Sequence, residues 1–341
     1  ESGFFKSNVE KFSGMAINDA NPEIIKDLKE RKLLFKTQKV THSYPFCWRC
    51  DSRLIYYAKK SWYIRTSEIK EKLLKSNDDV NWHPEHIKYG RYGKWLDNNI
   101  DWALTRERYW GTPLPIWQDD AGHKICIGSI EELKKLGDNV PDDIDLHKPY
   151  VDNIKIKCNI CGSEMKRTPE VIDVWFDSGS MPYAQYHYPF ENKELFESNF
   201  PADFICEAID QTRGWFYTLM TISTILFEKS CYKNVLCLGL INDESGQKMS
   251  KSKGNIIKPW DVLDNQGADA LRWYLFTSVS PWLPKNFSLK GVDEVIRKFL
   301  LIFWNTYSFF VIYANIDNFN PSEYKLDVKE RCELDRWIIS E

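Results

Sequence analysis

The sequence predicts an α/β protein with a parallel sheet, followed by the start of a helical bundle. Two short apolar runs bounded by turn residues, 171–176 and 235–241, have the composition of buried parallel strands. The segment 211–227 between them has helical apolar spacing, and a strand–helix–strand order implies a right-handed crossover. From 291 to 316 the apolar positions follow a helical period over a wide face, which is typical of a long bundle helix.

The length and composition favour a protein of the cytoplasm with more than one folding unit. The chain has 341 residues, and its net charge of −3 argues against a domain that holds nucleic acid through bulk positive charge. Nine cysteines without the dense, even framework of a small secreted domain favour a reducing compartment. The longest apolar stretch, 300–313, is too short and too polar to span a bilayer. Because the chain opens on Glu1, we expect the start of the gene product to lie upstream.

Further elements are expected upstream of the sheet. Asn21 as a cap and Pro22 in the first turn predict the start of a helix, and a second helix follows Thr66. The segment 77–117, dense in tryptophan, arginine, glycine and proline, suits an irregular packed stretch. The polar segment 119–162 is expected to form a small inserted lobe.

A lysine-rich loop follows the second predicted strand. Two lysines three positions apart at the carboxyl end of a parallel strand can reach one polyphosphate, because doubly wound folds bind ligands at that edge. Flexible ammonium groups stabilise the negative charge that grows on the α-phosphate and the departing pyrophosphate when a carboxylate attacks ATP. The alternative is a solvated loop without a ligand. The loop residues are Lys248, Met249, Ser250, Lys251 and Ser252.

This pentapeptide matches the signature of the class I aminoacyl-tRNA synthetases, and the resemblance to the isoleucyl members of that family continues to about Asn318. The segment 42–50, with 55–58 and 61–64 after it, resembles the isoleucyl pattern rather than the valyl or leucyl one. The resemblance implies a ligase that activates isoleucine with ATP and Mg²⁺ and esterifies tRNA(Ile), acting as a cytoplasmic monomer when intact. It also implies that the sheet is the C-terminal half of a Rossmann-like catalytic domain with inserted connective segments.

The segment 204–216 resembles the strand-to-helix segment with which isoleucyl enzymes hold the aminoacyl adenylate. By that resemblance Glu207 binds the adenylate, and Asp210 and Gln211 contribute polar contacts near the ribose and the amino acid. The alternative is that such acids only cap a helix. The family usually has glycine where this chain has Ala208, and a methyl group there would crowd the ligand if the backbone needs a positive φ or a close approach.

Two tryptophans resemble the aromatic walls of the family's isoleucine side-chain pocket. They are Trp175, within the family-like segment 173–180, and Trp215. Packing in the core is the alternative for any single tryptophan. A pocket of this kind separates isoleucine from valine by one methylene, about 1 to 3 kcal/mol, which is why the family needs editing as well.

The segment 101–117 resembles the RYWG segment shared by the isoleucyl, valyl and leucyl enzymes. Basic side chains interleaved with aromatic ones can bind phosphate and stack on bases near an RNA 3′ end. Packing of the same aromatics inside the protein is equally well supported. Arg106 and Arg108 are the candidates for contact with tRNA.

Two cysteine pairs have the spacing of metal ligands, and tetrahedral zinc needs four ligands. In some family members the first pair joins a pair that would lie upstream of Glu1, and the second joins a pair after the RYWG segment. That region has no such pair in this chain, so His123 or Cys126 would have to substitute. The alternative for each pair is a knuckle without metal. The pairs are Cys47 with Cys50 and Cys158 with Cys161.

The histidine motif of the HIGH type and the threonine-rich editing segment of the family do not occur in this chain, so we expect the chain to be inactive alone. Two rival functions stay open: an RNA-binding or regulatory paralogue without catalysis, and an enzyme with altered specificity, for example for valine. The expected domains are the tail of the editing insertion (1–45), a connective segment with the cysteine-bearing lobe (46–168), the second half of the catalytic domain (169–275), and a stem-contact region with the start of a helical anticodon-binding domain (276–341).

Overall fold

The computed structural model describes residues 3–47, 50–56, 58–250 and 254–341. The chain divides into two compact units, Glu1–Trp62 and Tyr63–Glu341. The first division therefore falls after Trp62, whereas the sequence placed a boundary after residue 45.

Among its described residues the first unit contains one α-helix, α1 (Ile17–Glu30). It begins at Ile17, with Ala16 as an extended N-cap, so the prediction that Asn21 caps it and Pro22 lies in its first turn is wrong. A contact with a segment outside the helix fixes where the helix starts, because Ala16 forms an antiparallel β-bridge with Phe4. A tertiary contact of this kind leaves no trace in the local sequence.

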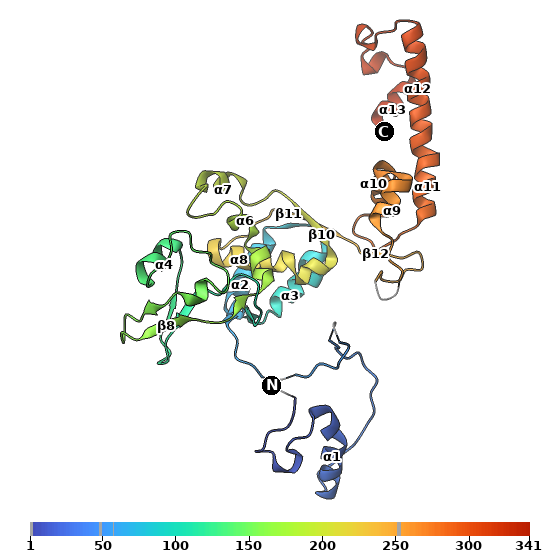
Figure 1. Ribbon diagram of the computed structural model, residues 1–341. Helices are drawn as coiled ribbons and strands as arrows, with labels where there is room; N and C mark the ends of the chain where they lie inside the picture. Colours follow the sequence, from blue (N-terminus) through green and yellow to red (C-terminus); the bar gives the residue numbers. More distant parts are fainter. Residues whose placement is uncertain (1–2, 48–49, 57, 251–253) are drawn as a thin grey trace. The chain divides into compact units, whose positions relative to one another are not determined.

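The second unit contains the expected parallel sheet (Figure 1). Its strands lie in the order β10 (Ile205–Ala208), β11 (Asn234–Leu238) and β2 (Asn81–His83), and both pairs are parallel. Helix α8 (Trp215–Phe227) connects β10 to β11, so the helix and the second strand of the predicted unit are confirmed, whereas its first strand is β10 and not the run 171–176. Strand β2 comes from the stretch that the sequence predicted to be irregular.

The apolar run 171–176 is not a parallel strand, so that prediction is wrong. Only β9 (Val171–Ile172) is extended, and it pairs antiparallel with β4 (Thr105–Arg106). The carboxylate of Asp173 then accepts from an amide two residues later at 3.2 Å and caps α5 (Val174–Gly179). An acid with this local hydrogen bond stops a strand and starts a helix.

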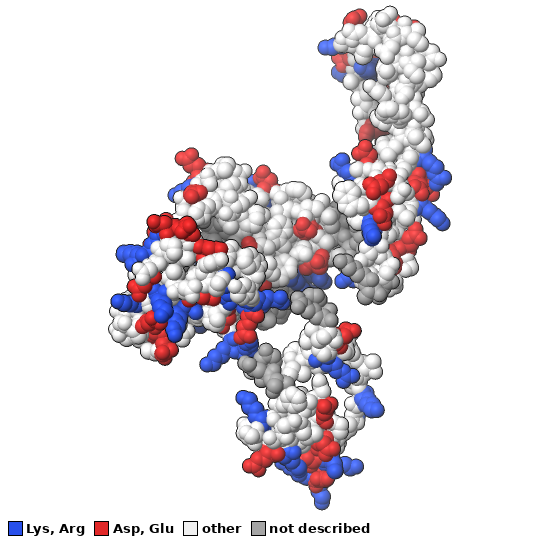
Figure 2. Space-filling model, in the orientation of Figure 1, with Lys and Arg blue, Asp and Glu red and all other residues white. Residues whose placement is uncertain are grey.

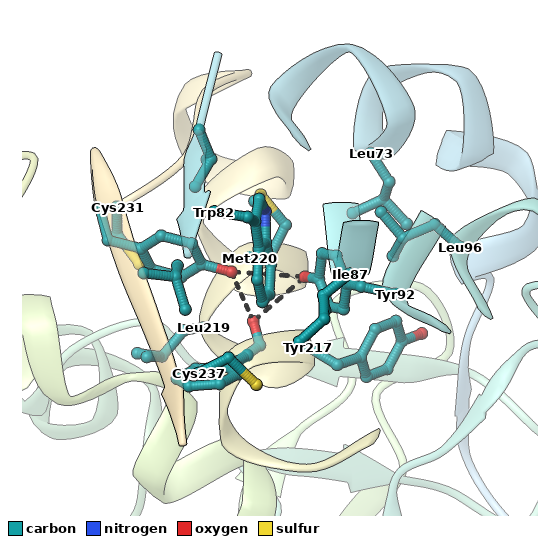
Figure 3. Close-up of a cluster of buried hydrophobic side chains, with 14 residues drawn as sticks. Leu73, Trp82, Ile87, Tyr92, Leu96, Tyr217, Leu219, Met220, Cys231 and Cys237 are labelled. Carbon is teal, nitrogen blue, oxygen red and sulfur yellow. Dashed lines mark hydrogen bonds between the residues drawn. The ribbon is translucent and has the colours of Figure 1, made fainter. Parts of the chain in front are cut away.

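The core beside the sheet is formed by α8, the strands and the two helices that follow Thr66 and Tyr92, α2 (Lys70–Asp78) and α3 (Gly93–Asp97). Two phenols are fully buried there, and both hydroxyls donate to the carbonyl of Phe216: Tyr92 at 3.3 Å and Tyr232 at 3.0 Å (Figure 3). Partnered in this way, the buried hydroxyls avoid the cost of an unsatisfied polar group.

The cysteine-bearing lobe has a core of its own, centred on Trp117, which is 2% exposed and donates its indole N–H to the carbonyl of Ile154 at 2.8 Å. The lobe comprises β5 (Ile116–Gln118), β6 (Lys124–Cys126), α4 (Ile130–Leu136), β7 (Ile156–Lys157) and β8 (Glu164–Arg167). Its strands form an antiparallel sheet in the order β6-β5-β8-β7.

Beyond β11 the chain crosses closely over a later segment. Gly239 donates its amide to the carbonyl of Pro281 at 2.9 Å, and a Cβ at Gly239 would lie 2.2 Å from the carbonyl oxygen of Leu283. Only glycine allows this approach. The crossing continues as a parallel pair of short strands, β12 (Ile241–Asn242) and β13 (Lys285–Asn286).

The helices after the sheet end in one long continuous helix. It runs from Leu289 to Ile316 over 28 residues, so the predicted bundle helix from 291 to 316 is confirmed as a helix. An apolar window in it has a mean hydropathy of 1.5 with no residue buried, and Figure 2 shows few charged groups on its second half. By length and composition the helix is able to cross a membrane, so the expectation that 300–313 is too short and too polar to do so is wrong for the whole helix. A helix of a soluble bundle passes the same test. The elements here are α9 (Pro259–Gln266), α10 (Ala268–Thr277), α11 (Leu289–Val295), α12 (Leu301–Ile316) and α13 (Glu333–Ser340).

Besides several 3₁₀ and π turns, the described part of the second unit contains four further short strands and α-helices. They are β1 (Tyr63–Ile64), which pairs antiparallel with β3 (Trp102–Ala103), and the helices α6 (Met181–Ala184) and α7 (Lys193–Asn199).

Candidate functional site

Two of the segments expected to bind substrate leave the parallel sheet at the same edge. Strand β10 ends at Ala208, which is paired with Leu238 at the end of β11. The segments 209–214 and 239–250 therefore both follow carboxyl ends of neighbouring parallel strands, the edge at which such sheets bind ligands.

The structure brings the two predicted wall tryptophans together around Gly214. A Cβ on Gly214 would lie 3.1 Å from the ring of Trp175, so the missing side chain makes room for that ring. Trp215 is held by its indole N–H, which donates to the carbonyl of Ser178 at 3.0 Å. Trp175 remains 41% exposed, so its ring retains apolar surface for a ligand. Their role as walls of an isoleucine pocket stays a prediction.

Gln211 has a structural task at this edge. Its Oε1 accepts from the amide of Trp215 at 2.9 Å, which caps α8, and its Nε2 donates to Asp210 at 3.1 Å. Asp210 and Glu207 are exposed. Ala208 has φ −74° and ψ 162°, an ordinary extended conformation, so the backbone there does not require glycine.

The structure describes the lysine loop as far as Ser250. The side chain of Lys248 is exposed, and its backbone forms a bridge with Asn242. Met249 is partly buried against the core of the helices that follow, which anchors the middle of the motif. Lys251 and Ser252 lie outside the described residues.

The loop is organised by Asp243 and Asn255, which the sequence analysis missed. Asp243 Oδ1 accepts from the amides of Ser245 and Gln247 at 3.0 and 2.8 Å. Asn255 Nδ2 donates to Asp243 Oδ2 at 2.7 Å, and this bond leads the contacts that lower the pKa of Asp243 to about 2. Asn255 Oδ1 in turn accepts from the amide of Ser250 at 2.8 Å. The stretch Asp-Glu-Ser-Gly at 243–246 is a turn signal that was available in the sequence.

Replacing Asp243 with alanine is expected to loosen this loop, because several donors lose one acceptor. Limited trypsin digestion at neutral pH should then cut at Lys248 several-fold faster than in the unsubstituted chain. In the unsubstituted chain, ionised Asp243 stabilises the loop fully at pH values above the unfolded pKa of about 4. This stabilisation is lost as the pH falls toward the pKa of Asp243 in the folded protein. Asp264→Ala, an exposed acid on α9, is the matched control. Equal cleavage rates in all three proteins would contradict the role given to Asp243.

The RYWG segment divides into a packed part and an exposed part. Arg106 donates to the buried carboxylate of Asp173 at 2.8 Å, so it has a structural partner. Arg108 is exposed, and the exposed ring of Trp110 stacks on His147 with centroids 4.7 Å apart. These contacts favour Arg108 over Arg106 as the residue available to RNA, and both assignments stay predictions.

The cysteine-bearing lobe holds a cluster of four possible metal ligands. One ligand atom from each of Asp119, His123, Cys158 and Cys161 lies within 4.8 Å of all the others. The β5–β6 turn supplies the first two, and the β7–β8 turn supplies the cysteines. Of the two substitute ligands that the sequence offered, His123 belongs to the cluster, whereas Cys126 is exposed and lies outside it. The sequence did not predict Asp119 as a ligand. Thiol, imidazole and carboxylate groups are the donors that zinc accepts.

Hydrogen bonds already connect the cluster. Asp119 Oδ2 lies 2.8 Å from His123 Nδ1 and accepts from Cys161 Sγ at 3.1 Å. Burial acts to raise the pKa of Asp119, but the hydrogen bonds from Cys161 and His123 outweigh it and hold that pKa well below its usual range. The bond to Asp119 in turn raises the pKa of His123. The carboxylate is therefore ionised and close to its neighbours.

The first cysteine of each pair makes an equivalent backbone hydrogen bond. The amide of Cys47 donates to the carbonyl of Ser52 at 2.8 Å, as that of Cys158 does to Ser163 at 2.8 Å. No third or fourth ligand gathers with Cys47 and Cys50 among the residues that the structure describes. A metal at this pair stays a prediction.

Comparison with known proteins agrees with these observations. The profile of the family described as tRNA synthetases class I (I, L, M and V) matches residues 10–283. Isoleucine–tRNA ligase from Clostridium kluyveri is 58% identical over 99% of the chain, which is 33% of that relative. The ligases of the same name from Clostridium tetani and Dehalococcoides mccartyi are 57% and 56% identical over 100% and 97% of the chain, again 33% of each relative.

The chain thus spans about a third of the length of the curated relatives it matches. A solved structure, Mycobacterium tuberculosis methionyl-tRNA synthetase in complex with methionyl-adenylate, covers 76% of this chain and 41% of its own with a TM-score of 0.50 and 17% identity. That likeness concerns the fold and agrees with the α/β architecture. Since the family profile covers most of the sequence, the chain belongs to the class I tRNA synthetases of the isoleucine, leucine, methionine and valine group.

Proposed function

We propose that the full-length protein activates L-isoleucine with ATP and transfers it to tRNA(Ile). The observation that carries this proposal is the match to isoleucine–tRNA ligases over 97 to 100% of the chain at 56 to 58% identity. The two tryptophans gathered around Gly214 support it, because flat apolar surfaces suit a branched aliphatic side chain.

In this proposal the isoleucine carboxylate attacks the α-phosphorus of ATP, forms isoleucyl-adenylate and releases pyrophosphate. A hydroxyl of the terminal tRNA ribose then attacks the carbonyl carbon and releases AMP. Lys248 stabilises the charge on the phosphates, together with Lys251. Glu207, Asp210 and Gln211 hold the adenylate, and Mg²⁺ would neutralise phosphate charge when ATP binds.

The test is amino-acid-dependent exchange of pyrophosphate into ATP by the full-length protein, measured for isoleucine, valine, leucine and methionine. Exchange with isoleucine at the highest kcat/KM supports the proposal. A preference for valine would show altered specificity. Absence of exchange with every amino acid, in a folded protein that still binds tRNA, would show the non-catalytic paralogue instead.

We also propose that the four-residue cluster of the lobe binds Zn²⁺. The support is the donor set itself, two thiols, an imidazole and a carboxylate whose ligand atoms lie within 4.8 Å of one another, since structural zinc takes four ligands of these kinds. Bound zinc would hold the β5–β6 turn against the β7–β8 turn and so stabilise the lobe.

Metal analysis of the purified full-length protein tests this site. Cys158→Ser and Asp119→Ala are each expected to lower zinc by one equivalent relative to the unsubstituted protein and to lower the melting temperature. Cys126→Ser is the matched control, because that thiol is exposed and lies outside the cluster. Unchanged zinc content in Cys158→Ser would remove the proposal.

The intact protein is further proposed to act as a monomer in the cytoplasm. All nine cysteines are free, as is usual in a reducing compartment. The helix from Leu289 to Ile316 is inferred to be a bundle helix, because the isoleucine–tRNA ligases align across it as part of 97 to 100% of the chain.

A further inference from the structure

Three cations line an open hollow that none of the assignments above uses. The hollow measures about 470 Å³ and is lined by Gly90, Arg91, Lys94, Trp95, Asn98 and Arg213. The lining comes from the segment 90–98, which follows β2, and from the end of the turn 209–213, which follows β10. The strands β2 and β10 both end at the carboxyl edge of the sheet, where ligands of such sheets bind.

Two of these cations are held in place by uncharged partners. Arg91 Nε donates to the hydroxyl of Thr212 at 2.9 Å, and Thr212 donates to the carbonyl of Ile209 at 2.7 Å. The guanidinium of Arg213 lies 5.2 Å from the ring centroid of Trp95. Both contacts orient the guanidinium without neutralising it, so most of its N–H groups remain available. A preorganised donor loses less conformational freedom when a ligand binds.

The positive charge of the hollow is not compensated within the described part of the chain. Arg91, Lys94 and Arg213 form no ion pair there, and no acid lines the hollow. Lys70 shows the contrast, since it pairs with Asp97 at 2.7 Å just outside the lining. In addition, the indole N–H of Trp95 is shielded from solvent and lacks an acceptor. Uncompensated like charges around one space favour an anion with several oxygens.

We propose that this cation hollow binds a phosphate group. A phosphate group presents at least two anionic oxygens and one to two negative charges, which match arginine forks and an ammonium group. Two sources have this chemistry, the backbone of a bound RNA strand and free pyrophosphate. The identification of the ligand as an RNA phosphate rests on the proposed function. The existence of a phosphate site does not depend on that function.

The experiment compares Lys94→Ala and Lys94→Glu with the unsubstituted full-length protein. Lys94 is exposed on α3, so the fold should survive, which the melting temperature checks. Lys75→Ala on α2 is the matched control, an exposed lysine outside the hollow. One arm titrates inorganic pyrophosphate by calorimetry. The other measures binding of a synthetic RNA hairpin with a single-stranded 3′ end over a salt series.

If an RNA phosphate occupies the hollow, Lys94→Ala should reduce the slope of log K against log salt by about 0.7 to 0.9, and Lys94→Glu should weaken the RNA further. If free pyrophosphate occupies it, the pyrophosphate Kd should rise several-fold in both variants while the RNA slope stays unchanged. If neither arm differs from Lys75→Ala, the hollow binds no phosphate and the inference is overturned. Pyrophosphate exchange by the unsubstituted protein is measured separately, so failure of the proposed function is distinguishable from failure of this site.

Discussion

Replacing Lys248 with alanine in the full-length protein is expected to lower isoleucine-dependent pyrophosphate exchange by about 10²- to 10³-fold, the usual effect of removing one preorganised group that stabilises transition-state charge. The ammonium group is exposed on a loop whose backbone is fixed by Asp243 and Asn255, so it can follow the phosphates while its base stays in place. The loss should fall on kcat more than on KM for isoleucine, because the charge it meets grows as the reaction proceeds.

Two further variants make this expectation specific. Lys248→Arg keeps the charge and should recover part of the rate. Lys290→Ala removes an exposed lysine from α11 and should leave the rate unchanged. Exchange within threefold of the unsubstituted rate in Lys248→Ala would mean that this lysine does not act on the phosphates.

Gly239→Val is expected to destabilise the second unit by about 3 kcal/mol or more, as severe overpacking against backbone does. Any Cβ at this position would lie 2.2 Å from the carbonyl oxygen of Leu283 and 2.7 Å from the nitrogen of Pro284. These are main-chain atoms, so no side-chain rotation relieves the clash. The crossing would have to open, which also breaks the bond from Gly239 to Pro281.

Urea unfolding followed by tryptophan fluorescence measures this loss as a lower midpoint. Gly90→Ala is the matched control, since nothing lies within 4 Å of a Cβ built there. It should leave the midpoint unchanged or raise it slightly, because alanine restricts the unfolded chain. A midpoint for Gly239→Val equal to that of the control would show that the crossing is not close in solution.

The sequence predicts the parts of the fold that local chemistry determines. The run 235–241 contains most of the parallel strand β11, because Val235 and Cys237 are buried in the core with α8. The segment 204–216, which the resemblance gave as strand-to-helix, forms β10 at its start and begins α8 at Trp215. Strand β2 was missed because it has only three residues, and pairing with β11 rather than composition makes it a strand. The run 171–176 has the composition of a strand but forms one over only two residues, because Asp173 ends the extended segment and caps the helix that follows.

The candidate site was predictable to a similar degree. Trp175 approaches the backbone beside Trp215. The resemblance placed both at one pocket, and that role stays a prediction. Asp119 was missed because one acid among several polar neighbours has no distinguishing pattern, and only the turn that folds it against Cys161 shows its place. Asp243 was missed although its turn signal was present.

The exposed apolar surface of α12 determines which length of polypeptide suits these experiments. Its large side chains, including Phe303 and Trp304, are 64% and 65% exposed, and the apolar window of this helix has no buried residue. Apolar surface of this extent drives association in water. The 341-residue polypeptide purified by itself should therefore self-associate as its concentration rises, with a sedimentation coefficient that increases on concentration and falls on dilution. Assays that depend on known molarity are best made with a longer polypeptide, in which more of the protein is available to cover this helix.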